Sequence, residues 1–325
     1  MIDVVTVTLN PSVDLSFSAE RLIDTVKLRC TKPRKDAGGG GINVARVLKR
    51  LGSTCLAMYM AGGSVGDCLA DLLDEERVAQ KRIAIRGETR ENITVLERST
   101  LHEYRFVMPG PAIEEREWRA CLEALEALEA MTPLPRYVVA SGSLPPGVPV
   151  DFYARVARWA HRHDVRMIVD ASGEALAAAL EMGVFLVKPS LDELRGLVGA
   201  PLATAAERRE AAELLVQRGS AHKVALSMGS GGALLAAADR TVALPAVPVH
   251  VVSAVGAGDS FLAALLWALD HEANSEEALR YALAAGSAAV LKPGTALCDT
   301  TDVIRLYRAS YDFAESDADG GDSNR

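Results

Sequence analysis

Apolar residues in this chain of 325 residues come in short runs, and longer amphipathic stretches separate these runs. Six runs have the length and composition of strands, at residues 4–9, 54–60, 136–140, 166–169, 184–187 and 223–228. Six stretches repeat apolar residues at helical spacing, at residues 41–51, 114–131, 150–163, 204–218, 257–271 and 275–291. Doubly apolar strands that alternate with helices predict an α/β fold, with helices on both faces of a mostly parallel central sheet.

Two segments depart from this alternation. Residues 14–29 alternate short apolar and polar stretches, and residues 92–97 and 104–107 flank a turn-like segment at 98–103 as the strands of a hairpin would. We therefore expect a small antiparallel β lid, formed by about residues 13–33 and 90–108, over one edge of the main domain. Such a lid is too small to bury its own apolar face, so we expect a homodimer joined through the lids. The apolar lid residues that a second copy would cover are Val26, Leu28, Ile93, Val95, Phe106 and Val107.

Composition excludes several classes of protein. The formal charge is −8, but residues 312–325 account for −4 of it, and no basic surface for nucleic acid is indicated. We expect this acidic tail to be disordered and residues 1–311 to form the folded domain. No apolar run reaches membrane-spanning length and no signal peptide precedes the first strand, which predicts a cytoplasmic protein without a membrane partner. The five cysteines are odd in number and widely spaced, so they indicate neither disulfides nor a metal site.

A glycine-rich segment late in the chain points to phosphate chemistry. Gly256, Ala257 and Gly258 precede Asp259 at the start of a predicted helix. Backbone N–H groups at a helix N-terminus bind anions, and a carboxylate at the same point can act as a general base. The alternative is an ordinary helix start in which Asp259 is a first-turn residue and the glycines belong to a loop.

A second glycine-rich segment favours the phosphate interpretation. Four consecutive glycines, residues 38–41, lead into a predicted helix that contains Asn43, and so much glycine is expected where a ligand approaches the backbone. The spacing does not fit a dinucleotide-binding fingerprint, no Gly-Lys pair of a P-loop occurs, and the protein-kinase motifs are missing. The sequence therefore predicts phosphate chemistry outside the commonest nucleotide-binding folds.

With these two segments, the chain resembles the ribokinase-like (PfkB) sugar kinases from about residue 4 to about residue 307. Residues 27–31, 38–46, 104–110, 141–147, 172–176 and 285–289 are similar to the minor ATP-dependent 6-phosphofructokinase branch of that family. The resemblance implies a three-layer ribokinase-like fold and phosphorylation of fructose 6-phosphate at its C1 hydroxyl, with ATP and Mg²⁺. Alternatives are a tagatose-6-phosphate or fructose-1-phosphate kinase, whose relatives usually differ at Gly40 and Leu28-Arg29, and a sugar-phosphate sensor without turnover.

The resemblance also implies a role for individual residues. Asp259 would be the base, and the N–H groups of Gly256, Ala257 and Gly258 would hold the migrating phosphoryl group. The residues implied at the sugar phosphate are Asp14, Lys27, Arg29, Gly39, Gly40, Asn43, Arg90, Arg105 and Ser141. Asn43 could also cap its helix, and the lid cations could form a solvated face.

The nucleotide and metal sites follow from the same resemblance. The residues implied at the nucleotide are Lys188, Ser190, Ser227, Gly229, Gly231 and Ser287, with Glu193 binding Mg²⁺ through water. Family members usually have asparagine where Ser190 stands. A hairpin turn at residues 227–232 and small-residue packing at Ser287 are the structural alternatives. The carbonyls implied for a potassium ion are those of Ser253, Val255, Ala289, Lys292, Gly294 and Ala296.

Overall fold

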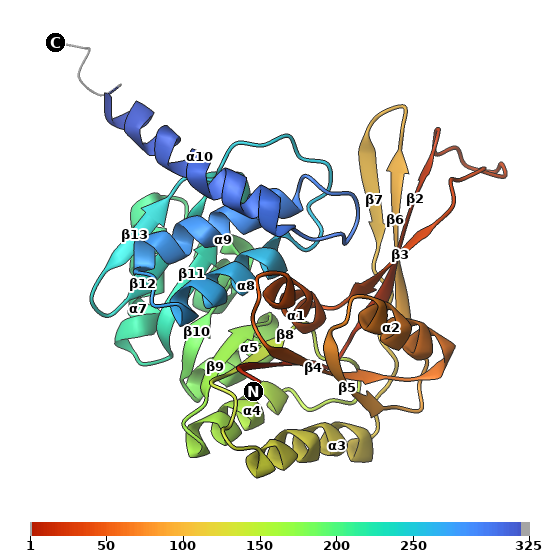
Figure 1. Ribbon diagram of the computed structural model, residues 1–325, viewed down its shortest axis with the longest axis horizontal. Helices are drawn as coiled ribbons and strands as arrows, with labels where there is room; N and C mark the ends of the chain where they lie inside the picture. Colours follow the sequence, from red (N-terminus) through yellow and green to blue (C-terminus); the bar gives the residue numbers. More distant parts are fainter. Residues whose placement is uncertain (1, 320–325) are drawn as a thin grey trace.

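A nine-stranded sheet runs through the molecule (Figure 1). The computed structural model describes residues 2–319, with side chains given through residue 310. The strands are β1 (Val4–Thr8), β4 (Cys55–Ala61), β5 (Ala79–Ala84), β8 (Tyr137–Ser141), β9 (Arg166–Asp170), β10 (Val184–Val187), β11 (Ala221–Ser227), β12 (Ala233–Ala237) and β13 (Thr241–Leu244). Their order is β13-β12-β11-β10-β9-β8-β1-β4-β5, and only the β11–β12 and β12–β13 pairs are antiparallel.

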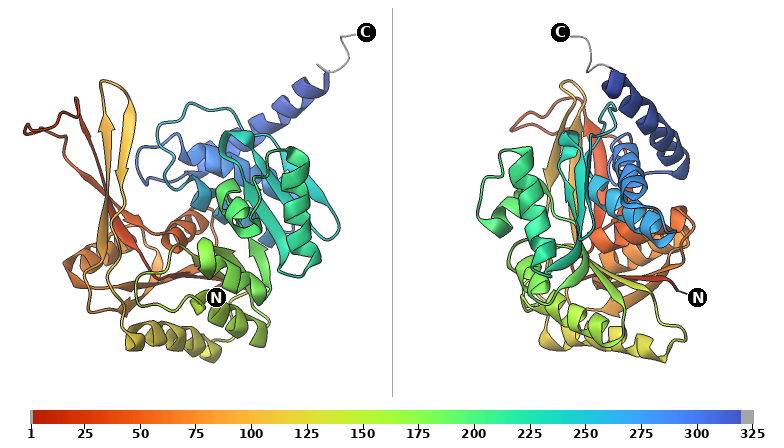
Figure 2. Two further views of the ribbon diagram at one scale, coloured as in Figure 1. Left: turned by 180° about the vertical axis from the view of Figure 1, so that it is seen from behind. Right: turned by 90° about the vertical axis from the view of Figure 1, so that its left-hand side faces the viewer.

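Helices cover both faces of this sheet, as Figure 2 shows in its right-hand view. On one face lie α1 (Gly40–Arg50), α2 (Gly63–Glu75), α8 (Ala257–Asp270), α9 (Ser275–Ala289) and α10 (Thr300–Asp319). On the other lie α3 (Glu115–Glu126), α4 (Phe152–Arg162), α5 (Gly173–Glu181), α6 (Leu191–Val198) and α7 (Ala205–Gln217). Each face has its own apolar core, and β1 supplies Val4 to one core and Val5 to the other. This alternation is the physical basis of the doubly apolar strands in the sequence.

The predicted α/β fold is confirmed, with differences in detail. All six predicted strands and six predicted helices are present, although residues 127–130 form a 3₁₀ turn instead of the last turn of α3. The prediction missed α2, α5, α6, α10, β5, β12 and β13. The pattern of β5 was hidden because its sequence, AQKRIA, lies at the sheet edge and is largely polar.

The lid is a second sheet of four strands, β3-β2-β6-β7. Its strands are β2 (Ser12–Ala19), β3 (Arg34–Gly38), β6 (Arg90–Glu97) and β7 (His102–Phe106). The prediction of an antiparallel lid was wrong for the central pair, because β2 and β6 run parallel and only the outer pairs are antiparallel. The prediction also missed β3, whose charged and glycine-containing sequence lacks the usual strand residues.

The C-terminal helix α10 extends into the segment that was predicted to be a disordered acidic tail. The helix continues through residue 319, whereas disorder was expected from residue 312. The sequence offers a reason, since no glycine or proline interrupts residues 300–319 before Gly320. The rest of the predicted tail, residues 320–325, lies outside the described residues. Within residues 2–319, no helix is both long enough and apolar enough to cross a membrane.

Candidate active site

The N-terminus of α8 is the centre of the candidate site. Gly256 caps the helix in the left-handed conformation, with φ of 73°, and a Cβ atom there would lie 2.3 Å from Leu297 Cδ2. Only glycine therefore fits this turn without strain. The first N–H groups of a helix have no acceptor within the helix, so those of Ala257 and Gly258 are free to bind an anion.

Asp259 lies in the first turn of α8 and contacts α1. Asn43 donates from Nδ2 to Asp259 Oδ2 at 2.8 Å, and Arg46 donates to Asn43 Oδ1 at 3.3 Å. Arg46 therefore sets the orientation of the amide, and the amide sets that of the carboxylate. Burial raises the pKa of Asp259, although the Asn43 hydrogen bond and the Lys188 charge both oppose this. A raised pKa suits a carboxylate that must accept a proton from a hydroxyl.

The capping role considered for Asn43 is wrong. The N-cap of α1 is Gly39, and Asn43 lies inside the helix, where it donates its backbone N–H to Gly39 O at 2.8 Å. Its side chain is buried and serves Asp259 instead.

Lys188 supplies a buried cation beside the same helix. Its Nζ lies 3.1 Å from Asp170 Oδ1 and 3.6 Å from the position that a Cβ of Gly258 would occupy. Burial raises the pKa of Asp170, against the attraction of Lys188. Burial alone would lower the pKa of Lys188, but attraction to Asp170 raises it above its usual value. The ammonium group therefore stays charged next to the N–H groups of α8, where it can bind phosphate.

Asp14 is the centre of the part of the site that the lid provides. Its carboxylate accepts hydrogen bonds from Ser12 Oγ at 2.7 Å, Asn92 Nδ2 at 3.0 Å and Thr295 Oγ1 at 2.7 Å. These donors come from β2, β6 and the loop after α9, so they fix Asp14 between the lid and the main domain. A Cβ at Gly38 would lie 2.5 Å from Asp14 Oδ2, which explains why β3 ends in glycine.

The glycine-rich segment also reaches Ser141 at the end of β8. A Cβ at Gly40 would lie 2.2 Å from Ser141 Oγ, so the serine hydroxyl and the glycine backbone are in close contact. Gly39 has a φ of 114°, and a Cβ there would lie 2.9 Å from Thr8 Cγ2 and 3.0 Å from Pro11 Cα. The structure thus brings Gly40 and Ser141, two of the residues implied at the sugar phosphate, into contact, with Gly39 beside them.

The predicted lid cations divide into two groups. Arg90 is partly buried and donates to the carbonyls of Asn10 at 2.9 Å and Met108 at 3.0 Å, so part of its guanidinium has a structural role. Burial lowers its pKa, against the attraction of Asp14. Lys27, Arg29 and Arg105 are exposed and make no hydrogen bond or ion pair to any described residue of this chain. The fold of a single chain does not bring these three side chains into contact with the groups around Asp14 and Asp259.

A cavity of about 620 Å³ leads away from the first turn of α8. Residues from α8, α9 and two loops line it, among them Ser227, Gly229, Gly258, Phe261 and Ser287. Its walls are mostly apolar, with the N–H groups of the first turn of α8 at one end, which suits a purine nucleotide. The turn that contains Gly229 and Gly231 joins the antiparallel strands β11 and β12, so the predicted hairpin is also a wall of the cavity.

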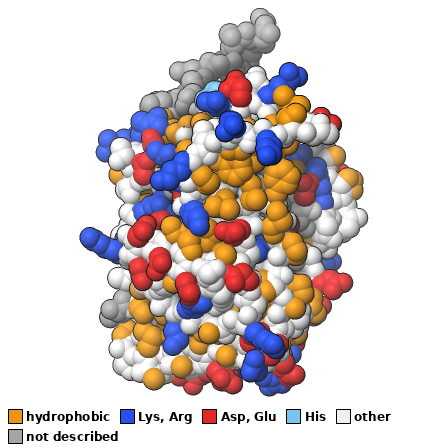
Figure 3. Space-filling view, turned by 90° about the vertical axis from the view of Figure 1, so that its right-hand side faces the viewer, with side chains coloured by type: hydrophobic (Ala, Val, Ile, Leu, Met, Phe, Trp, Pro, Cys, Tyr) orange, Lys and Arg blue, Asp and Glu red, His pale blue; other side chains and the backbone are white. Residues whose placement is uncertain are grey.

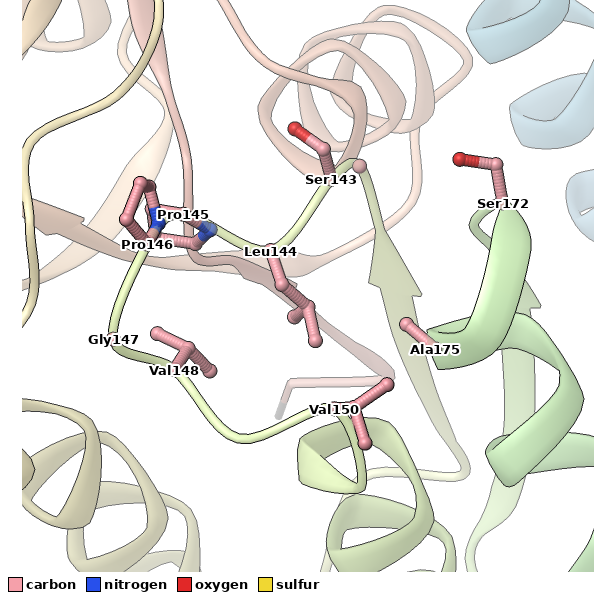
Figure 4. A pocket seen from close by; sticks show the side chains of 10 residues that line it. Ser143, Leu144, Pro145, Pro146, Gly147, Val148, Val150, Ser172 and Ala175 are labelled. Atoms are coloured by element: carbon pink, nitrogen blue, oxygen red, sulfur yellow. The ribbon is translucent and has the colours of Figure 1, made fainter.

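A second cavity, of about 440 Å³, lies between the loop after β8 and the start of α5 (Figure 4). Its ten lining residues include Leu144, Val150 and Ala175, and none of them is charged. It therefore lacks the groups that a phosphate needs, and the larger cavity is the better nucleotide site.

Ser190 and Glu193 form a capping box at the start of α6. Ser190 Oγ accepts from the Glu193 N–H at 3.2 Å, and Glu193 Oε2 accepts from the Ser190 N–H at 2.7 Å. This explains how serine can replace the family's asparagine, since both residue types cap helices well. Within the described residues, no group of three or more acidic, histidine or cysteine side chains could hold a metal ion. The charge of Glu193 acts on Lys188, so this carboxylate lies near the buried cation beside α8.

The two segments with the predicted cation carbonyls lie side by side. Val252 donates its N–H to Val290 O at 2.7 Å, which joins the segment before α8 to the end of α9. Two of the six carbonyls also accept protein hydrogen bonds, Ala289 from the Lys292 N–H and Ala296 from Arg50 Nη1. A carbonyl oxygen has two lone pairs, so the set still fits a monovalent cation.

Sequence reasoning missed several residues of the site, namely Arg46, Asn92, Asp170 and Thr295. Asp170 had a usable signal, because it directly follows a predicted strand at the edge where parallel sheets bind ligands. Thr295 and Asn92 had no signal in the local sequence, because they contact Asp14 only through the tertiary fold.

Comparison with known proteins assigns the family. A relative from Mycobacterium tuberculosis named ATP-dependent 6-phosphofructokinase isozyme 2 is 42% identical over 96% of this chain and 91% of its own length. The crystal structure of phosphofructokinase-2 from Escherichia coli in complex with potassium has a TM-score of 0.89 and 39% identity, and that in complex with fructose-6-phosphate has 0.88 and 38%. Each match covers 96% of this chain and 100% of the other. The model of the pfkB family carbohydrate kinases matches residues 2–302, and this chain belongs to that family.

Proposed function

We propose that this protein transfers the γ-phosphoryl group of ATP to the C1 hydroxyl of fructose 6-phosphate. The observation that carries the proposal is the position of Asp259 at the N-terminus of α8: it follows Gly258, which lines the larger cavity, and its charge interacts with that of Asp14. The relatives named 6-phosphofructokinase support the choice of sugar.

Different residues would bind the sugar and accept the proton. Asp14, Asn43, Gly39, Gly40 and Ser141 would hold the sugar so that its C1 hydroxyl meets Asp259. As that oxygen forms its bond to the γ-phosphorus, Asp259 accepts the hydroxyl proton, and the bond from the γ-phosphorus to the bridging oxygen breaks to leave ADP.

Charge on the transferred group is stabilised by groups already in place. The N–H groups of Gly256, Ala257 and Gly258, together with Lys188, would surround the transferred phosphoryl group, and the position of Lys188 beside Gly258 supports this. Fixed dipoles need no reorganisation during the reaction, which is the main source of catalysis in phosphoryl transfer. When bound, Mg²⁺ would supply positive charge that offsets the charge of the nucleotide phosphates. Lys188, Ser190, Ser227, Gly229, Gly231 and Ser287 would bind the nucleotide, and Glu193 a water of the metal.

We also infer a homodimer that forms through the lid. Val26, Phe106 and Val107 are about half exposed or more, at 55%, 49% and 63%. Hydrophobic side chains gather in the upper part of the face shown in Figure 3, bordered by lysine and arginine. Val95 is buried within the chain at 6% exposure, so the expectation that a partner covers it was wrong.

A dimer would also account for the three exposed cations. Lys27, Arg29 and Arg105 make no contact with their own site, and a two-fold partner could bring them to the neighbouring sugar phosphate. Phe106→Asp should yield monomers by light scattering, with weaker fructose 6-phosphate binding than wild type. An active monomeric wild type at assay concentration would overturn the dimer.

The function is tested by ADP release with a panel of sugar phosphates. Fructose 6-phosphate should have the highest kcat/KM, above tagatose 6-phosphate and fructose 1-phosphate. A higher value for either of the others would reassign the substrate. Sugar binding without ADP release from any of them would indicate a sensor.

A further inference from the structure

Arg46 of α1 is a buried cation that contacts several segments around the site. Its helix packs against α8 and also contacts the lid strand β3 (Figure 1). The Arg46 side chain is only 1% exposed, and its ion-pair partner Glu76 directly follows α2. A buried charge must be paired and hydrogen-bonded, so the partners of this guanidinium show which parts of the molecule it holds together.

Three acceptors converge on one nitrogen of Arg46. Its Nη1 lies 2.6 Å from the carbonyl oxygen of Ala37 in β3 and 3.2 Å from that of Thr295 in the loop after α9. Asn43 Oδ1, on α1 itself, lies 3.3 Å away. This nitrogen carries two protons, so the three acceptors share two donors. A shift of the lid strand, the loop or the amide therefore changes the hydrogen bonds of the other two.

Two of these acceptors lead to the two carboxylates of the site. Asn43, held through its Oδ1, donates from Nδ2 to Asp259 Oδ2 at 2.8 Å. Thr295, held through its carbonyl, donates from Oγ1 to Asp14 Oδ2 at 2.7 Å. Arg46 is therefore separated by a single residue from each of two carboxylates that lie on different elements.

Glu76 fixes the other side of the guanidinium. Its Oε1 accepts from Arg46 Nε at 2.8 Å and lies 2.5 Å from Nη2. Its Oε2 accepts from Arg50 Nη2 at 3.1 Å. Burial would raise the pKa of Glu76, but hydrogen bonds and attraction from the two arginines hold it below its usual value. A planar guanidinium held at Nε and Nη2 presents Nη1 in a fixed direction, which a flexible lysine ammonium group does not reproduce.

We propose that Arg46, oriented by Glu76, is a positioning residue that aligns Asp259 and Asp14 with each other for phosphoryl transfer. The inference rests on the proposed function for the reaction and for the identity of the sugar. A displacement of about 1 Å at reacting groups can lower a rate by about 10²-fold. Loss of this alignment should therefore lower kcat, beyond any effect on substrate binding.

Arg46→Lys keeps the positive charge and removes the planar fork. In steady-state kinetics, kcat with fructose 6-phosphate should fall by about 10- to 10²-fold. KM for ATP should stay close to the wild-type value, because Arg46 does not line the larger cavity.

Arg280→Lys is the matched control. Arg280 is also buried, at 8% exposure, and it likewise pairs with a glutamate, Glu276, and donates to a carbonyl, that of Ser310. These contacts join α9 to α10 and do not include Asp14, Asp259 or their partners. The control should have a lower Tm than wild type but a wild-type kcat.

The pH dependence of kcat separates position from charge. Burial raises the pKa of Asp259, and the charge of Arg46 is among the groups that oppose this rise. Activity needs the carboxylate, so it falls as pH drops through this pKa. Arg46→Lys keeps the charge, so the fall should occur at the wild-type pH, with a reduced kcat at the plateau. Arg46→Met also removes the charge, so its fall should occur at higher pH.

Glu76→Ala is the second test where Arg46→Lys fails to fold. The Glu76 side chain is 30% exposed, and its loss leaves Arg46 in place without the groups that orient it. This variant should lose kcat as well, with KM for ATP again close to the wild-type value.

A wild-type kcat in Arg46→Lys, or an equal loss of kcat in Arg280→Lys, would overturn the positioning role. A shifted pH profile in Arg46→Lys would overturn it too, because the effect would then come from charge. Where Glu76→Ala replaces Arg46→Lys, a wild-type kcat in that variant would overturn it. ADP release by wild type with fructose 6-phosphate tests the proposed function without any of these variants, so the two failures are distinguishable.

Discussion

The buried pair of Asp170 and Lys188 offers a sharp test of how the site keeps its cation. Asp170→Asn preserves the shape of the side chain and removes its charge. Lys188 is then a buried ammonium group whose side chain is 6% exposed and whose only ion-pair partner has been lost. Burial, which lowers the pKa of Lys188 on its own, would no longer be opposed by Asp170.

The expected loss of folding stability in Asp170→Asn follows from this burial. Removing one partner of a buried ion pair typically destabilises a protein by about 3–5 kcal/mol. Asparagine still offers an oxygen to Lys188, so the loss should lie at or below the lower end of that range. Asp192→Asn is the matched control, because Asp192 pairs with Arg195 at 2.9 Å but its side chain is 89% exposed. An exposed pair contributes about 0–1 kcal/mol.

The assay combines urea unfolding with kcat measured against pH. A lysine is charged below its pKa, so a lowered pKa means that the activity of Asp170→Asn falls as pH rises, while wild type keeps its Lys188 charge. Lowering the pH should restore part of the variant's activity. Wild-type stability together with a wild-type pH profile would refute the assignment of Lys188 as a cation maintained by Asp170.

Three further substitutions test other parts of the site. Gly256→Ala should lose about 1–3 kcal/mol of stability in thermal unfolding and most of its kcat, because φ of residue 256 is 73° and the new Cβ would clash with Leu297. Near-normal activity of this variant would contradict the role of the turn. Ser190→Ala should lose about 0.5–2 kcal/mol with the cap of α6, whereas Ser190→Asn should retain both stability and turnover; equal losses in the two would contradict the capping account. Arg90→Ala should raise KM for fructose 6-phosphate far more than KM for ATP, and equal rises in steady-state kinetics would indicate a purely structural role.

Much of the fold was predictable because the strands of the parallel sheet are apolar on both faces, as in β1 and β10. The phosphate site was predictable for a different reason. Its contacts come from backbone N–H groups, and the glycines that expose them, such as Gly256, are visible in the sequence.

What could not be predicted depends on long-range pairing. The parallel β2–β6 pair joins residues far apart in the chain, and no local pattern specifies which strands become neighbours. The contact of Arg46 with Asn43 and the position of Asp36 against Gly294 arise only when α1, the lid and the loop after α9 meet. Thr295 likewise carries no signal of its contact with Asp14.

The role of Asp259 as general base is tested most directly by single-turnover phosphoryl transfer in Asp259→Asn. The account predicts a rate about 10²–10⁴ lower than wild type, with ATP and fructose 6-phosphate affinities nearly unchanged. Wild-type activity should fall as pH drops through the raised pKa of Asp259, because only the carboxylate accepts the proton, and the variant should lose this dependence. A variant that transfers the phosphoryl group at close to the wild-type rate would contradict the account.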